Sequence, residues 1–276
     1  MVVVDGGRPR NAVAPHMHGV LGHDGLPPLG LLARGRAEIA GYGGRFIDGE
    51  VSTARVRQGD GRIEALTPAG TLGTRRLLVA TGLRDEPPDL PGLAEQWGRG
   101  VVVCPYCDGW EHRDDIVGVV ATSPHSVEQA QLLRQWSERV VFFPHLSPVP
   151  DAATVDAFAR RDIRVESGTV TRLRIEDGTV TGVELEGRTI AVGVVFTGPT
   201  PRPSDGLLRT LGARVLAGPM GEWVDVDGDG RTSVPGVWAV GNVVDARANV
   251  PVSLGAGSLV AGALNADLIA EDVRNA

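Results

Sequence analysis

The sequence predicts an α/β protein in which one domain is inserted into another. Short apolar runs typical of buried strands alternate with segments of helical spacing along the chain. Two stretches rich in proline and glycine, residues 87–92 and 198–203, interrupt this alternation and are typical of linkers. Strand–helix units lie on both sides of each linker, and this arrangement favours an inserted domain.

Before the first linker, the pattern predicts strands, turns and one helix. The first apolar run ends at Asp5, and Gly6 and Gly7 follow, as expected where a buried strand enters a loop. Another apolar run, at residues 75–80, ends in the Ala-Thr-Gly turn of residues 80–82. The predicted elements are a strand at residues 2–4, a helix at 29–40, short strands within 45–74 and a strand at 75–80.

After the first linker, the pattern predicts a strand–helix–strand unit and then several short strands divided by turns. After the second linker, the pattern predicts one more strand and a helix of small residues. The predicted elements are strands at residues 116–121 and 140–143, a helix at 126–136, short strands within 164–195, a strand at 236–240 and a helix at 253–269.

The composition excludes several classes of function. The 276 residues carry a net charge of −7 and the pI is about 5.4, which argues against nucleic-acid binding. All 27 basic residues are arginine, so neither a Schiff-base lysine nor a lysine-bearing phosphate loop exists.

The first residues, the length of the apolar runs and the number of cysteines indicate the cellular location that we expect. The first ten residues lack the basic region of a signal peptide, and stretches such as residues 116–121 are too short to cross a bilayer. Two cysteines do not make a disulfide-rich secreted scaffold. We expect a cytoplasmic protein that binds neither membrane nor nucleic acid.

Both cysteines lie in one short motif, Cys104-Pro-Tyr-Cys107, and Asp108 follows directly. The spacing is typical of a redox dithiol, and a helix that starts at Cys107 would lower the pKa of that thiol. Asp108 is placed to exchange a proton with a leaving thiolate. Zinc is the alternative, with His16 and His18 as further ligands, although the spacing matches no zinc ribbon or finger. An inert pair is a third reading.

Four motifs, in order along the chain, resemble those of the low-molecular-weight thioredoxin reductases and their flavoprotein relatives. They are the Ala-Thr-Gly turn at residues 80–82, CPYCDGWE at 104–111, the TSVPGVWAVGN segment at 232–242 and the Gly-Ala-Gly segment at 255–257. The resemblance extends over nearly the whole chain.

The resemblance implies two Rossmann-like domains of the three-layer ββα type, with FAD in the split outer domain and NADPH in the inserted one. It places the FAD-binding domain at residues 1–86 and 204–276, and the inserted domain at 87–203. It also implies that Cys107 lies against the flavin, that Cys104 attacks the substrate disulfide and that Asp108 is the acid–base residue. A thioredoxin-like protein or a small disulfide would be the partner, and the protein would be a homodimer.

The residues expected to hold FAD lie in the two parts of the outer domain. No metal site is expected. The cofactor residues that the resemblance implies are Asp5, Gly6, Gly7, Arg8, Asn11, Val51, Ala80, Thr81, Gly82, Gly241, Asn242, Asn249 and Val250.

The sequence departs from the family in the outer domain at two places. An FAD domain of this kind opens with a strand and a G-x-G-x-x-G motif, and an acidic residue that holds the ribose follows about 20 residues later. Asp5 matches that acid, so the first strand and the motif are missing, and the chain is expected to start late by roughly 25 to 30 residues. Asn242 replaces the usual aspartate, which keeps a carbonyl acceptor and loses a charge.

The inserted domain departs from the family at its own nucleotide motif. Ala121 and Ser123 replace the glycines that allow the tight turn and the close approach of the pyrophosphate. Residues 144–147 replace the basic triplet that holds the 2′-phosphate of NADPH. NADPH binding at this site is therefore doubtful.

The leading hypothesis is a thioredoxin reductase-like flavoprotein, an FAD-dependent disulfide oxidoreductase that moves electrons between FAD and a substrate disulfide or dithiol through Cys104 and Cys107. A dithiol oxidase that uses oxygen and no NADPH, of the gliotoxin type, is the first alternative, favoured by the altered nucleotide motif. A non-catalytic remnant with impaired FAD binding is the second, because the glycine fingerprint is missing.

Overall fold

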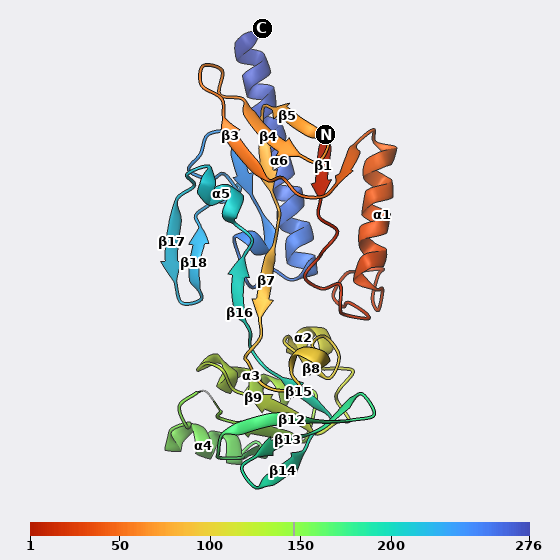
Figure 1. The fold of residues 1–276 in the computed structure, drawn as a ribbon, viewed down its shortest axis with the longest axis vertical. Helices are drawn as coiled ribbons and strands as arrows, with labels where there is room; N and C mark the ends of the chain where they lie inside the picture. Colours follow the sequence, from red (N-terminus) through yellow and green to blue (C-terminus); the bar gives the residue numbers. More distant parts are fainter. Residues whose placement is uncertain (146) are drawn as a thin grey trace. The chain divides into compact units, whose positions relative to one another are not determined.

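The computed structural model describes residues 1–145 and 147–276 (Figure 1). The chain forms two compact units, one of residues 1–85 and 201–276 (unit 1) and one of residues 86–200 (unit 2). It leaves unit 1 along β7 (Leu83–Glu86) and returns along β16 (Thr200–Pro203), and these two strands pair with each other. The fold is of the α/β class.

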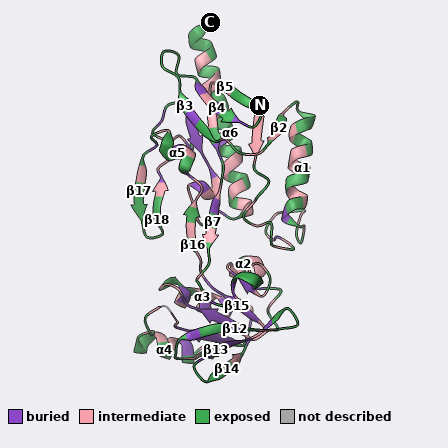
Figure 2. Ribbon diagram, in the orientation of Figure 1, coloured by how far each residue is buried: buried purple, intermediate pink, exposed green. Residues whose placement is uncertain are grey.

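Unit 2 is built on a five-stranded parallel sheet in the order β11-β10-β9-β15-β8. Its central strands are runs of valine and phenylalanine that are buried along their whole length, as expected of a sheet covered on both faces (Figure 2). The strands are β8 (Val101–Val102), β9 (Val117–Val120), β10 (Val140–Phe143), β11 (Ile163–Val165) and β15 (Val194–Phe196).

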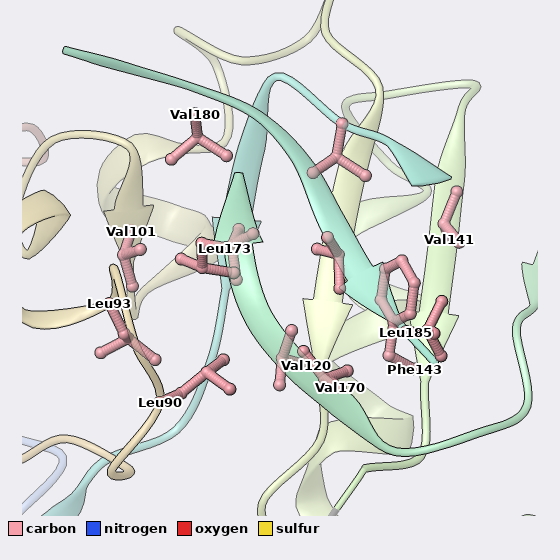
Figure 3. Packing of buried hydrophobic residues seen from close by; sticks show 13 residues of the cluster. Leu90, Leu93, Val101, Val120, Val141, Phe143, Val170, Leu173, Val180 and Leu185 are labelled. Carbon is pink, nitrogen blue, oxygen red and sulfur yellow. The ribbon is translucent and has the colours of Figure 1, made fainter. Parts of the chain in front are cut away.

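Alternate residues of these strands pack against different layers, because successive side chains of a strand point to opposite faces. Phe142 packs with Phe158 and the helical layer. Phe143 lies beside Leu185 of an antiparallel sheet, in the cluster that also contains Leu173 (Figure 3). Unit 2 therefore has three layers, ββα. The covering elements are α3 (His125–Leu133), α4 (Ala152–Ala159), β12 (Val170–Glu176), β13 (Thr179–Leu185) and β14 (Arg188–Ala191).

The parallel strands of unit 1 form two separate pairs among the described residues, β1 with β2 and β6 with β19. β1 is only half-buried along its length, and α1 buries only Pro28. The elements are β1 (Val2–Asp5), α1 (Pro28–Gly41), β2 (Arg45–Asp48), β3 (Thr53–Val56), β4 (Ile63–Thr67), β5 (Gly70–Thr74), β6 (Leu77–Val79), α5 (Gly206–Thr210), β17 (Val215–Gly218), β18 (Gly221–Val224), β19 (Val237–Ala239) and α6 (Val250–Asn275).

The long helix α6 corrects the sequence-based reading of apolar runs. Its 26 residues are long and apolar enough, by length and composition alone, to cross a membrane, whereas residues 116–121 form only a short strand. The apolar character of α6 is difficult to recognise in the sequence, because alanine and glycine interrupt its pattern of large apolar residues. In unit 1, Val260 of α6 packs on Trp238, and Arg76 forms ion pairs with Asp267 and Glu271.

Candidate functional site

Cys104 and Cys107 form a disulfide across the first turn of α2 (Pro105–Asp108). Their Cα atoms are 5.2 Å apart, and the Cys107 and Asp108 N–H groups donate to the Cys104 carbonyl at 2.9 and 3.1 Å. The expected helix start at Cys107 is wrong. The helix begins at Pro105 and Cys104 is its N-cap residue, because proline is well suited to a first helical position that needs no N–H donor.

Packing against Trp136, three residues after the end of α3, holds the disulfide turn in unit 2. A Cβ atom on Gly109 would lie 3.0 Å from the Trp136 ring, so glycine allows the end of α2 to approach that ring. The Tyr106 ring meets the edge of the same tryptophan at 5.6 Å. Cys104, Cys107 and Asp108 are all half-buried, so burial does not distinguish the two cysteines and their separate roles stay predictions.

The loop between β9 and α3 occupies the place expected for a nucleotide pyrophosphate. Thr122 N–H donates to Ser126 Oγ at 3.2 Å, Ser126 N–H donates to the Ser123 carbonyl at 3.0 Å, and Pro124 has no N–H. Glu128 adds a carboxylate to the first turn of α3 and lines a cavity of about 290 Å³ beside Pro105. Two backbone N–H groups of this loop are thus engaged within the protein, and Pro124 offers none to a pyrophosphate.

The second phosphate site of unit 2 was expected at residues 144–147, of which Leu146 lies outside the described residues. Burial lowers the pKa of His145, so this imidazole is neutral near pH 7 and supplies no cation for a 2′-phosphate. The described residues at these two places, the start of α3 and residues 144, 145 and 147, do not fit the phosphates of NADPH.

In unit 1, Asp5 lies at the end of β1 with its carboxylate held in place. Gly7 N–H donates to one oxygen at 2.9 Å, and Arg36 donates to the other at 2.5 Å. Arg36 also pairs with Asp48 and covers the Phe46 ring at 4.2 Å. The fixed orientation suits an acceptor for ribose hydroxyl groups, the role that the sequence predicts for this residue.

The turn at residues 80–82 is tied to the segment that re-enters unit 1. Thr81 Oγ1 donates to the Ser204 carbonyl at 2.7 Å, and Ser204 N–H donates to the Gly82 carbonyl at 2.9 Å. Gly82 has a φ of +70°, and a Cβ atom added to Gly82, or to Gly255 or Gly257 of α6, would meet no protein atom within 4 Å. These glycines leave room for a close ligand.

Other predicted cofactor residues have different surroundings. Arg8 is exposed and paired with Glu50, and Val51 packs at the edge of the unit 1 core. Asn249 is the N-cap of α6, where its side chain accepts the Val252 N–H at 3.1 Å. The hydrogen bond to the α6 backbone therefore fixes the orientation of the Asn249 side chain.

Asn242 has a role that the sequence did not reveal. Its amide nitrogen donates to the carbonyls of Asp245 and Ala248 at 2.9 and 2.8 Å, and so folds the loop that leads to Asn249. Its Oδ1 atom faces Arg10 Nη1 at 3.5 Å. Because a carboxylate cannot donate, an aspartate here could not form these two hydrogen bonds, so asparagine adds a donor as well as removing a charge.

We expect Asn242→Asp to destabilise the protein by about 1–3 kcal/mol, because a carboxylate would face two or more carbonyls in place of hydrogen bonds. Urea unfolding of the apoprotein measures the change. Asn265→Asp, which alters an exposed position of α6, is the matched control. Equal free energies of unfolding for the two variants would contradict the role assigned to the amide.

Sequence and structure comparisons connect this arrangement to known proteins. The sequence profile of the pyridine nucleotide-disulphide oxidoreductase family matches residues 40–257. Thioredoxin reductase tcpT of Claviceps purpurea is 28% identical over 98% of this chain and 87% of its own length. A probable thioredoxin reductase of Arthroderma benhamiae is 29% identical over 52% of this chain, and the match spans only 37% of that protein.

Among solved structures, the crystal structure of HlmI is 48% identical to this chain. The match covers 99% of this chain and 86% of HlmI, with a TM-score of 0.92. The profile match to residues 40–257 and the similarity to thioredoxin reductase tcpT confirm the family resemblance predicted from the four motifs.

Proposed function

Because this chain belongs to the pyridine nucleotide-disulphide oxidoreductase family, we propose that it is an FAD-dependent disulfide oxidoreductase that moves electrons between flavin and a substrate disulfide or dithiol. The observation that carries the proposal is the Cys104–Cys107 disulfide, closed over the first turn of α2 and followed directly by Asp108. A disulfide that spans two intervening residues at a helix start is suited to reversible opening.

Starting from the reduced Cys104–Cys107 dithiol, the exchange with a substrate disulfide balances without further reactants, and opening the internal disulfide beforehand takes one electron pair. In the reducing direction, the Cys104 thiolate attacks a substrate disulfide, forms a mixed disulfide and releases one substrate thiolate. Cys107 then attacks Cys104, which restores the internal disulfide and releases the second thiolate. Asp108 gives a proton to a departing thiolate. In the oxidising direction, the same steps run in reverse and a substrate dithiol becomes a disulfide.

FAD, when bound, would supply and accept the electron pair that opens and closes the internal disulfide. Unit 1 offers residues that fit this cofactor. Asp5 presents a fixed carboxylate for ribose, and Gly82, Gly255 and Gly257 leave open space beside the backbone. The relatives named thioredoxin reductases support a thioredoxin-type protein or a small disulfide as partner, and we include a homodimer in the proposal.

A dithiol oxidase that passes electrons to oxygen is the second candidate function. The observation that favours it is the start of α3, the place at which the family resemblance puts the pyrophosphate of NADPH, where Pro124 offers no N–H and Glu128 adds a carboxylate. Such an enzyme would convert a dithiol and oxygen to a disulfide and hydrogen peroxide. It would need no pyridine nucleotide.

We expect NADPH to bind more weakly than about 1 mM, because a dianionic 2′-phosphate and a pyrophosphate would meet a carboxylate and a neutral histidine. Anaerobic mixing of flavin-loaded protein with NADPH should leave the flavin oxidised, while a dithiol should bleach it. Sodium dithionite is the control that shows the flavin to be reducible. Rapid bleaching by micromolar NADPH would exclude the oxidase version and contradict the reading of unit 2.

The proposed function itself is tested by steady-state assays on flavin-loaded protein. Oxidised thioredoxin with a reduced flavin donor tests the reducing direction, and hydrogen peroxide release from a small dithiol tests the oxidising direction. Turnover in either assay that requires both cysteines supports the proposal. Turnover in neither, with flavin bound, would contradict it.

A further inference from the structure

An arginine that no sequence motif identified joins three segments of unit 1. Arg10 lies in the loop after β1 and donates to Asp85 of β7 through Nε at 2.7 Å and Nη2 at 2.8 Å. The Asp85 side chain is only 10% exposed and that of Arg10 is 30% exposed, so the carboxylate is the sheltered partner of this pair. Two parallel hydrogen bonds fix the plane of the guanidinium group.

The other edge of the same guanidinium points to the residues expected to hold FAD. Nη1 lies 3.5 Å from Asn242 Oδ1, at the limit of hydrogen bonding, in contrast to the two short bonds to Asp85. Each segment that meets here carries predicted cofactor residues. Asn11 is the neighbour of Arg10, Gly82 lies three residues before Asp85, and Asn242 follows Gly241.

The orientation of Asn242 explains why Arg10 can meet an anion there. The amide nitrogen of Asn242 is committed to the carbonyls of Asp245 and Ala248, so its oxygen must face the arginine. An oxygen held at 3.5 Å is a weak acceptor for a cationic donor, and a phosphate oxygen would be a much stronger one. Arginine is the side chain whose planar fork best matches phosphate.

We propose that Arg10, held by Asp85, donates from its Nη1 edge to the diphosphate of FAD. The inference rests on the proposed function, because it concerns the cofactor of that function. Arg10 would thus be both the link that holds three segments together and a cationic donor to the diphosphate. Asp85 acts through Arg10 and is a positioning residue.

Flavin affinity of the apoprotein tests the proposal without any measurement of turnover. Arg10→Gln alone would leave the sheltered Asp85 carboxylate without its partner and could unfold the unit, so the informative variant is the double change Arg10→Gln with Asp85→Asn. It removes both charges, keeps the shape of the side chain at position 85 and leaves a shorter neutral amide at position 10. Arg55→Gln is the matched control, because Arg55 forms a comparable pair with Glu64 on the exposed face of β3 and β4.

We expect the double variant to keep the melting temperature of the apoprotein close to that of the wild type and to bind FAD about 10- to 100-fold more weakly, as for a lost charge-assisted hydrogen bond. Its affinity for riboflavin, which lacks phosphate, should change less than about twofold. The control should match the wild type for both ligands. Fluorescence titration measures all of these affinities.

Two results would overturn the proposal. Unchanged FAD affinity in the double variant would show that Arg10 does not meet the cofactor, and equal losses for FAD and riboflavin would place its contact away from the diphosphate. Failure of the wild type to bind FAD is a different outcome, because it would contradict the proposed function as well.

Discussion

Cys107→Ser is expected to lower turnover at least about 1,000-fold, because removing the resolving thiol ends the chemistry at the mixed disulfide. The variant should accumulate a covalent adduct between Cys104 and the substrate, which mass spectrometry of the intact protein detects. Cys104→Ser should be equally inactive and should form no such adduct. The two variants therefore test the separate roles of the cysteines, which the burial of their side chains leaves open.

The control for both variants is flavin binding. Neither cysteine is among the unit 1 residues expected to hold FAD, so flavin content should equal that of the wild type. An adduct on Cys107 in the Cys104→Ser protein would reverse the assigned roles. Turnover near the wild-type rate in either variant would contradict the dithiol mechanism.

Asp108→Asn is expected to lower kcat by about 100-fold or more, because general acid–base groups typically contribute factors of this size. The amide keeps the shape of the side chain and removes its ability to give up a proton. The pH–rate profile should lose one limb in the variant, a change that a merely structural defect would not produce.

Asp114→Asn is the matched control for Asp108→Asn, since Asp114 is an exposed aspartate six residues further along unit 2. It should leave kcat and the pH profile unchanged. A pH profile of Asp108→Asn with both limbs intact would show that another group moves the proton.

The strands of unit 2 were the most predictable part of the fold. Residues 140–143 were predicted as a strand and β10 has these limits, because a run of apolar residues buried on both faces needs no periodicity to be recognised. Helix limits were less accurate. The helix predicted at 126–136 ends at Leu133, and α6 begins three residues before the predicted start because Asn249 caps it ahead of Pro251.

The residues of the candidate site also differ in how far the sequence alone predicts them. The dithiol and Asp108 are adjacent in sequence, so a short motif reveals them. Arg10 and Asp85 are 75 residues apart and become partners only through the fold. The hydrogen bonds of the Asn242 side-chain amide depend on the path of the loop that follows it. The sequence therefore indicates that asparagine lacks the charge of the family's aspartate, but it cannot indicate that the amide donates to this loop.

The central claim is that Cys104 and Cys107 exchange electrons with FAD, and an anaerobic reductive titration of flavin-loaded protein tests it most directly. A small dithiol is added in steps while the absorbance of the oxidised flavin is recorded. We predict that the wild type is bleached and that the protein with both Cys104→Ser and Cys107→Ser, loaded with the same amount of FAD, is not. Bleaching of the double variant at the wild-type rate would contradict the claim.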